Sequence, residues 1–221
     1  MGSEMCIRDR IHSNAQVLEL QRDDDDWIVQ TKNQSWRAPV VINAAGAWAD
    51  QIGALAGAQK IGLVPCRRSA FTFKPEFPGD FSQWPMTYGA SEDWYIKPDA
   101  GMMLGSPANA DPVEPHDVCP EELDIAVAIS RIEEMTSLAI RRPAHTWAGL
   151  RSFVDDHALV GGFDVQAKGF FWVAAQGGYG IQTSPAMGEA CASLIRGLGI
   201  PEHIAAWGLT VEMLSPARLI K

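Results

Sequence analysis

The stretch best suited to bind a ligand is Gln176–Gly180, where three of five positions are glycine. The aromatic and apolar run Phe170–Ala175 before them predicts a buried strand, and Ser184-Pro185 after them predicts the N-cap and first residue of a helix. Glycines at such a turn let a ligand approach the main chain, and a helix start offers free N–H groups. The flat anionic edge of a cofactor fits this turn, and so does a tight turn with no ligand.

A second strand end with small residues occurs in Arg37–Gly46. The residues 40–42 are consecutive β-branched residues, which is typical of a strand covered on both faces. The small residues of Asn43–Gly46 follow, and 48–56 predicts a helix. A nucleotide above the strand end fits this pattern, as does a plain strand–turn–helix.

The elements that must position these turns are mostly strands. Strands are predicted at residues 15–20, 27–31, 63–73, 94–97, 102–105, 146–153 and 159–163. A helix is predicted from Pro120 to about Leu138, with an apolar face of Leu123, Val127, Ile132 and Met135. The acidic run 22–26 predicts a solvated hairpin turn, with a cation site as the alternative. We therefore expect a mixed α/β (α+β) fold with a β-rich antiparallel layer beside part of an α/β domain.

Composition excludes several classes of protein. The 221 residues carry a net charge of -9 with no basic run, which argues against a nucleic-acid partner. No apolar stretch approaches the roughly 18 residues of a membrane span. Four distant cysteines and five scattered histidines form no metal pattern. We expect free thiols, a cytoplasmic location or peripheral attachment to the inner membrane, and we interpret residues 1–10 as a cloning scar or sequencing artefact.

Three motifs occur in an order and spacing that resembles the FAD-dependent D-amino-acid oxidase superfamily. They are Asn43-Ala-Ala-Gly-Ala-Trp48, Trp147-Ala-Gly-Leu-Arg151 and Gln176-Gly-Gly-Tyr-Gly-Ile-Gln-Thr183. Further motifs are most similar to those of bacterial D-arginine dehydrogenases, namely Arg67-Arg-Ser-Ala-Phe71, Tyr95-Ile-Lys-Pro-Asp-Ala-Gly101, Leu104-Gly-Ser-Pro-Ala-Asn-Ala-Asp-Pro112, Ile140-Arg-Arg-Pro143 and Met213-Leu-Ser-Pro216. The resemblance extends from Ala15 to the end of the chain.

The resemblance implies two domains. Residues 11–62 and 144–221 would form the remaining part of an FAD-binding α/β domain, and residues 63–143 a substrate domain with a large mixed, mostly antiparallel sheet. The Gly-x-Gly-x-x-Gly fingerprint of the superfamily is absent, as are its active-site residues from the first half, including the acidic group that would receive a guanidinium. We therefore expect a truncated chain that is inactive alone.

The superfamily also implies substrate-binding residues. Arg151 matches its carboxylate-binding arginine, because a guanidinium fork holds a carboxylate with two hydrogen bonds. Tyr95 and Arg68 match further donors to that carboxylate, and the carbonyl of Gly178 would accept from the substrate amine. Strand alternation sends Arg67 to the opposite face from Arg68, and we favour Arg68.

Cofactor contacts follow from the same resemblance. The backbone from Gly177 to Gln182 would line the flavin edge, through the residues Gly177, Gly178, Tyr179, Gly180, Ile181 and Gln182. Val17, Ala45 and Gly46 would meet the nucleotide part of FAD. No catalytic acid or base and no metal ligand is expected, since an amine bound in its neutral form can release hydride directly.

The implied activity is oxidative deamination of D-amino acids, with D-arginine as the best candidate and a quinone or another molecule as electron acceptor. One alternative is a glycine- or sarcosine-type amine oxidase that uses oxygen. The other is a non-catalytic fragment. Tyr88, in the loop before Tyr95, is a candidate for setting side-chain preference.

Overall fold

The computed structural model describes residues 10–220 and divides the chain into two compact units. The first unit comprises the residues up to Ile61, the segment Val160–Ala174 and the residues from Thr183 onward. The second comprises Gly62–Leu159 and Ala175–Gln182. The segment 1–10 that we interpreted as an artefact lies, except for Arg10, outside the described residues.

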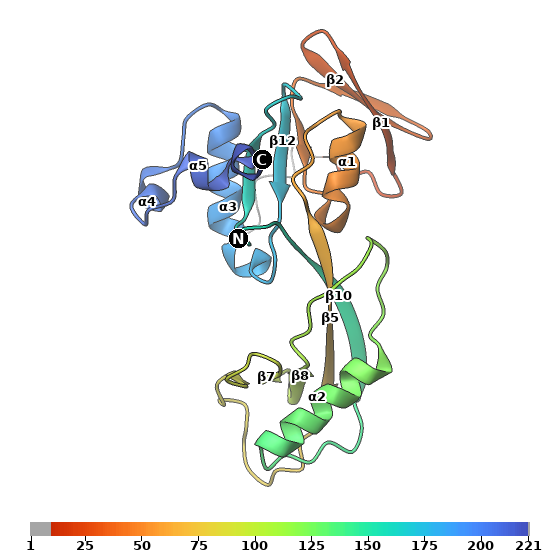
Figure 1. The fold of residues 1–221 in the computed structure, drawn as a ribbon, viewed down its shortest axis with the longest axis vertical. Coiled ribbons are helices and arrows are strands. Elements are labelled where there is room, and N and C mark those ends of the chain that lie inside the picture. Colours follow the sequence, from red (N-terminus) through yellow and green to blue (C-terminus); the bar gives the residue numbers. More distant parts are fainter. Residues whose placement is uncertain (1–9, 221) are drawn as a thin grey trace. The chain divides into compact units, whose positions relative to one another are not determined.

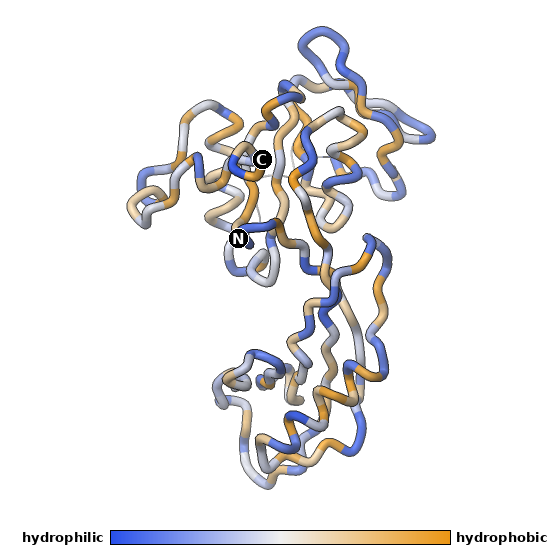
Figure 2. The backbone as a smooth tube through the Cα atoms, in the orientation of Figure 1, coloured by the Kyte–Doolittle hydropathy of each residue, from blue (hydrophilic) through white to orange (hydrophobic). Residues whose placement is uncertain are grey.

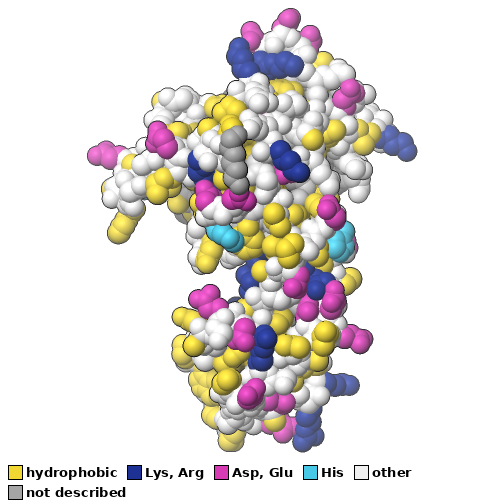
Figure 3. Space-filling model, viewed as in Figure 1, with side chains coloured by type: hydrophobic (Ala, Val, Ile, Leu, Met, Phe, Trp, Pro, Cys, Tyr) yellow, Lys and Arg dark blue, Asp and Glu magenta, His cyan; other side chains and the backbone are white. Residues whose placement is uncertain are grey.

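The first unit begins with an antiparallel sheet of β1 (Val17–Asp23), β2 (Asp26–Thr31) and β3 (Ser35–Ala38), drawn in red and orange in Figure 1. The acidic run forms the β1–β2 turn. Arg37 on β3 pairs with Asp23 at 2.5 Å and with Asp26 at 2.7 Å. Figure 3 shows acidic and basic side chains gathered at this tip. The predicted hairpin turn is therefore confirmed.

A second sheet of this unit has the order β11 (Val160–Phe163), β12 (Phe170–Ala174), β4 (Val41–Asn43). β12 pairs in parallel with β4 and antiparallel with β11. Three consecutive residues of β12, Phe170, Phe171 and Trp172, are 0% exposed, so this strand is buried on both faces as its sequence predicts. Around the sheet lie η2 (Gly46–Trp48), α1 (Ala49–Leu55), α4 (Glu202–Ala205), α5 (Val211–Leu214) and η3 (Pro216–Leu219).

The second unit contains a six-stranded sheet. Its order is β10 (His145–Phe153), β5 (Val64–Phe73), β8 (Met102–Ser106), β7 (Tyr95–Asp99), β6 (Thr87–Tyr88), with β9 (Asp111–Pro112) paired to β5. All strand pairs given for this sheet within residues 10–220 are antiparallel. The mixed α/β architecture with antiparallel sheets confirms the predicted fold class.

Helix α2 (Glu122–Met135) packs on one face of this sheet. Its buried side chains are Ile125, Ala128 and Ile132, which pack against Phe71 and Phe73 of β5. The predicted apolar face is confirmed only for Ile132, which is 0% exposed, and is wrong for Leu123 and Met135, which are 71% and 65% exposed. A spacing of three and four residues is satisfied by more than one set of apolar positions, and the sheet selects the set centred on Ala128. Figure 2 shows α2 alternating between hydrophobic and hydrophilic colour along its turns.

Helix α3 (Gly180–Ile195) begins four residues before Ser184, so the predicted N-cap is wrong and Pro185 lies inside the helix. The φ angle of proline suits a helix, but at this sixth position of α3 its missing N–H removes one main-chain hydrogen bond. The chain therefore turns directly from the glycines into the helix.

β10 lies in the second unit with β5, although we predicted that residues from 144 onward belong to the cofactor domain. The reason is a ladder of nine residue pairs, from His145–Thr72 to Phe153–Val64. Within residues 10–220, no helix combines the length and apolar character that a bilayer crossing needs.

Candidate functional site

One face of the six-stranded sheet carries three of the predicted substrate residues. In the β10–β5 ladder Gly149 lies opposite Arg68, and Arg151 lies opposite Cys66. Directly paired residues share a face, and so do residues two apart on a strand, so Arg68, Gly149 and Arg151 lie on the same face. Tyr95 lies between Trp94 and Ile96, which belong to the α2-facing core. Its side chain therefore points to the same face as the two arginines, opposite α2.

The side chain of Arg151 lies against the glycine turn. A Cβ atom placed on Gly178 would be 3.0 Å from Nη1 of Arg151 and 3.5 Å from its Cζ. The main-chain N–H of Gly177 donates to the carbonyl of Ser152 at 3.1 Å, and a Cβ on Gly177 would be 2.8 Å from the ring of Phe153. The absence of side chains at Gly177 and Gly178 is therefore what lets the turn dock on the end of β10.

Arg68 completes a pair of neighbouring cations. Its Nε donates to the main-chain oxygen of Asn109 at 2.5 Å, and it shares a side-chain hydrogen bond with Tyr95. Burial, followed by the positive charge of Arg151, lowers the pKa of Arg68 below its ordinary value. A guanidinium stays protonated at neutral pH, so the two cations repel each other. A bound carboxylate would relieve that repulsion and accept hydrogen bonds from both.

Arg67 is directed to the opposite face, as strand alternation requires. It pairs with Asp111 of β9 and Asp124 of α2, each at 3.3 Å, and also with Glu121. These carboxylates are thereby held on the α2 side of the sheet. The structure therefore brings Arg68, and not Arg67, next to Arg151.

The glycine turn offers less free backbone than the sequence suggested. The N–H groups of Gly177 and Tyr179 already donate to the carbonyls of Ser152 and Gln176. Gly178 and Tyr179 are exposed, and Ile181 is 94% exposed. The surface that the turn presents is thus bare main chain at Gly178 beside the Arg151 guanidinium, which fits the edge of a flat ring.

In the first unit, Ala45 and Gly46 lie at the end of β4. The buried amide of Asn43 holds this turn, because it accepts from Ala45 N–H at 3.2 Å and donates to the Ala49 carbonyl at 2.8 Å. Gly46 has a φ of 57°, and a Cβ there would meet nothing within 4 Å. The turn is therefore rigid and open over Gly46, which fits a group that contacts the main chain closely.

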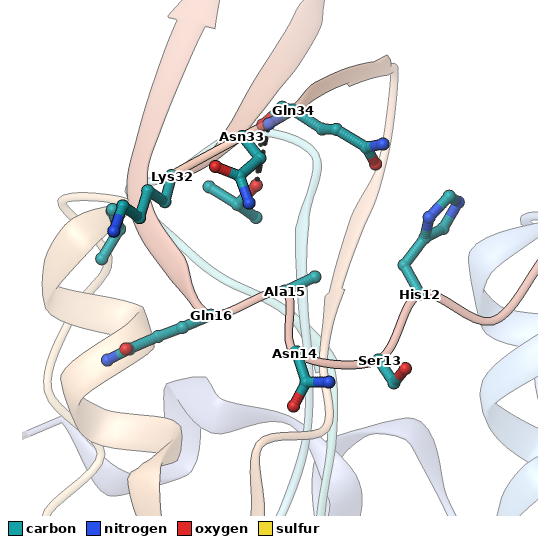
Figure 4. Close-up of a pocket in the computed structure, with 10 residues that line it drawn as sticks. His12, Ser13, Asn14, Ala15, Gln16, Lys32, Asn33 and Gln34 are labelled. Atoms are coloured by element: carbon teal, nitrogen blue, oxygen red, sulfur yellow. Dashed lines mark hydrogen bonds between the residues drawn. The ribbon is translucent and has the colours of Figure 1, made fainter.

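Val17 is the first residue of β1 and pairs with Thr31. A pocket of about 350 Å³ lies beside it, lined by residues 12–16, 18 and 31–34. Figure 4 shows its walls, which come from the segments 12–16 and 32–34. The Thr31 hydroxyl donates to the main-chain carbonyl of Gln34 at 2.9 Å. Neither Ala45 nor Gly46 lines this pocket.

Sequence reasoning missed Gly149 and Asn109. Gly149 leaves open space opposite Arg68, since a Cβ there would meet no atom within 4 Å. Its place two residues before Arg151 was a usable signal, whereas the contact of Asn109 with Arg68 spans 41 residues and has no local signature. Within residues 10–220 no cluster of His, Cys, Asp and Glu is arranged to hold a metal ion.

Comparison of the sequence with known protein families gives a match over most of the chain. The profile of the family described as "FAD dependent oxidoreductase" (DAO) matches residues 9–194. The FAD-dependent oxidoreductase domain-containing protein 1 of Bos taurus is 27% identical over 207 residues, which are 83% of this chain and 41% of that protein. This chain thus spans less than half of that relative.

Two solved structures share the fold. L-proline dehydrogenase from P. horikoshii superposes with a TM-score of 0.74 at 24% identity, covering 92% of this chain and 53% of that one. Glycine oxidase from Geobacillus kaustophilus gives a TM-score of 0.68 at 19% identity, covering 86% and 52%. At identities this low, the likeness shows a shared fold and does not identify a substrate.

Proposed function

The chain belongs to the FAD-dependent oxidoreductase (DAO) family, and on that premise we propose that it supplies the carboxylate-binding part of a D-amino-acid dehydrogenase. The observation that supports this most is the convergence of Arg68, Arg151 and Tyr95 on one sheet face, with the Arg151 guanidinium against Gly178. FAD is the cofactor of the family, and when bound it supplies the acceptor for a hydride.

Each residue of the site has a proposed task. Arg151 and Arg68 hold the substrate carboxylate, and the Tyr95 hydroxyl adds a third donor. The Gly178 carbonyl accepts from the substrate amine, so carboxylate and amine together fix the direction of the Cα–H bond. The main chain of 177–182 would line the flavin edge, and Val17, Ala45 and Gly46 would contact the nucleotide portion.

The reaction class follows from this arrangement. Loss of hydride from Cα, with the amine lone pair closing the C=N bond, gives a protonated imino acid. Water hydrolyses that imino acid to a 2-oxo acid and ammonia. No side chain of the site is required as a base when the amine binds in its neutral form.

D-Arginine is the proposed substrate because of the motifs shared with bacterial D-arginine dehydrogenases. The two cations of the site are suited to the carboxylate end only, and the carboxylates near β5 are engaged by Arg67. The cationic side chain of D-arginine must therefore be received elsewhere in the complete enzyme. Tyr88, which is 61% exposed and directly opposite Tyr95, is placed to contact that side chain.

The second candidate is an oxygen-dependent amine oxidase that acts on glycine or sarcosine, which the fold shared with a glycine oxidase supports. Hydrogen peroxide formed in step with substrate consumption separates it from a dehydrogenase, which needs a quinone or dye. A purified protein that stays colourless with added FAD and binds no carboxylate would instead support a non-catalytic fragment.

The test that requires no turnover is titration of the chain with benzoate and with D-arginine, followed by NMR or calorimetry. Removing a charge-assisted pair costs about 1.5–3 kcal/mol, so Arg151→Met should weaken binding roughly 10- to 150-fold. Arg141→Met is the matched control, because Arg141 forms only an exposed pair with Glu76. Equal binding by Arg151→Met and the wild type would refute the carboxylate site.

A further inference from the structure

The Arg68 guanidinium needs an anchor to stay beside Arg151. The two side chains carry like charges, and a long arginine side chain loses rotamer freedom when it is held in one position. Apart from Tyr95, the anchor is the main-chain carbonyl of Asn109, which accepts from Arg68 Nε at 2.5 Å. The position of the guanidinium therefore depends on the position of the Asn109 carbonyl.

The side chain of Asn109 determines where that carbonyl lies. Its Oδ1 accepts from the Ser69 N–H at 2.9 Å, which ties the loop to β5. Its Nδ2 donates to Asp111 at 2.6 Å and to Asp124 at 3.1 Å, which ties the loop to β9 and α2. One amide therefore joins three elements of the unit at the point where Arg68 is held.

The loop before Asn109 is fixed by buried hydroxyls. Ser106, 0% exposed, donates to the Ser69 carbonyl at 2.7 Å and accepts from the Ala108 N–H at 3.1 Å. Ala108 has a φ of 52°, a left-handed conformation that is unfavourable for a non-glycine residue. Such a conformation persists only where surrounding contacts impose it. The loop therefore has one well-defined path, which places the Asn109 carbonyl under Arg68.

We propose that Asn109 is a positioning residue that holds the Arg68 guanidinium in place for the substrate carboxylate. The inference rests on the proposed function, because it assigns Asn109 to the same site. Asn109 acts through its main-chain carbonyl, which contacts Arg68 directly, while its side chain bonds to Ser69, Asp111 and Asp124. The amide is required rather than a carboxylate, since it must accept from Ser69 and donate to two aspartates at once.

The test uses the full chain with benzoate as the probe and three variants. Asn109→Ala removes all three side-chain hydrogen bonds. Asn109→Asp keeps an acceptor for the Ser69 N–H but places a carboxylate beside Asp111 and Asp124, to which it cannot donate. Arg131→Ala is the control, because it removes the ion pair of α2 with Asp93 and touches neither Arg68 nor Asn109.

Three quantities are measured for each variant: the solvent exchange rate of the Arg68 Nε–H signal, the benzoate Kd and the urea midpoint of unfolding. The Nε–H signal is assigned by its loss in Arg68→Lys. We expect Asn109→Ala to speed Nε–H exchange at least tenfold and to weaken benzoate binding three- to tenfold. Asn109→Asp should lose at least as much in log Kd as Asn109→Ala does, because its carboxylate cannot donate to the two aspartates. Arg131→Ala should lower the urea midpoint without changing either site readout.

The possible outcomes distinguish a failure of the positioning role of Asn109 from a failure of the proposed function. If the wild type binds benzoate and Asn109→Ala leaves Nε–H exchange and Kd unchanged, the positioning role is overturned and the proposed function stands. If the site readouts of Asn109→Ala change only in proportion to its urea midpoint, Asn109 is merely structural and the proposal is also overturned. If the wild type binds no carboxylate, the proposed function and the positioning role both fail. Slow solvent exchange of the Arg68 Nε–H in that wild type would show that a misfolded site is not the cause.

Discussion

Substitution of Gly178 by alanine tests the geometry of the site without removing any charge. The added Cβ would lie 3.0 Å from Arg151 Nη1, whereas ordinary contacts begin at 3.4 Å. The guanidinium must therefore move by about 0.4 Å, the difference between these two distances. Because Gly178 lacks a left-handed φ, alanine adds no backbone strain there.

We expect Gly178→Ala to weaken benzoate binding and to leave the free energy of unfolding almost unchanged. The end of a flexible side chain moves cheaply, so the free energy of unfolding should change by less than about 1 kcal/mol. A displaced fork loses at most one of its two charge-assisted hydrogen bonds, about 1.5 kcal/mol, which corresponds to roughly tenfold in Kd. We therefore predict that Gly178→Ala weakens benzoate binding by roughly three- to tenfold.

Calorimetric titration with benzoate measures this, and Gly188→Ala is the matched control. Gly188 lies within α3, where a Cβ would meet nothing within 4 Å. Alanine there should leave the Kd unchanged and stabilise the helix by about 0.5–1 kcal/mol. If Gly178→Ala binds benzoate as well as the wild type does, Arg151 does not grip the carboxylate from its position against the turn.

The remaining predictions concern stability. Burial raises the pKa of the Cys191 thiol from 9.0 to about 11. The unfolded thiol ionises first, so this contribution to stability is full below pH 9 and is lost as the pH rises through 11. The loss is about 2–3 kcal/mol, urea unfolding across this range measures it, and a Cys191→Ala variant that loses just as much over this range would contradict the assignment. Ile132, 0% exposed between α2 and the sheet, should cost about 2–5 kcal/mol when changed to alanine, and a loss near zero on urea unfolding would mean that α2 does not pack as described.

Local patterns were sufficient for the strands and for the glycine turn. The buried run Phe170–Ala174 and the alternation around Arg67 and Arg68 depend on neighbours in the chain, and both appear in the structure as predicted. The acidic β1–β2 turn is local in the same way. The family motifs added the expectation of FAD, which the family match supports.

Other features depended on contacts between distant segments. The start of α3 at Gly180, the buried face of α2 and the place of β10 beside β5 were not predicted correctly or fully. The buried face of α2 is chosen by packing, because several helix faces are equally apolar in sequence and the sheet covers one of them. The place of β10 follows from its pairing with β5.

The sequence by itself determined which residue types were available, namely two arginines, a tyrosine and bare glycine backbone, and it predicted that neighbouring arginines face opposite ways. The tertiary structure decided which arginine joins Arg151, because the register of β5 against β10 and the side covered by α2 are both set by long-range pairing. It alone decided that Asn109, 41 positions from Arg68, holds that guanidinium. A hydrogen bond between distant residues leaves no periodicity in the chain, so it can be found only once the strands are in register.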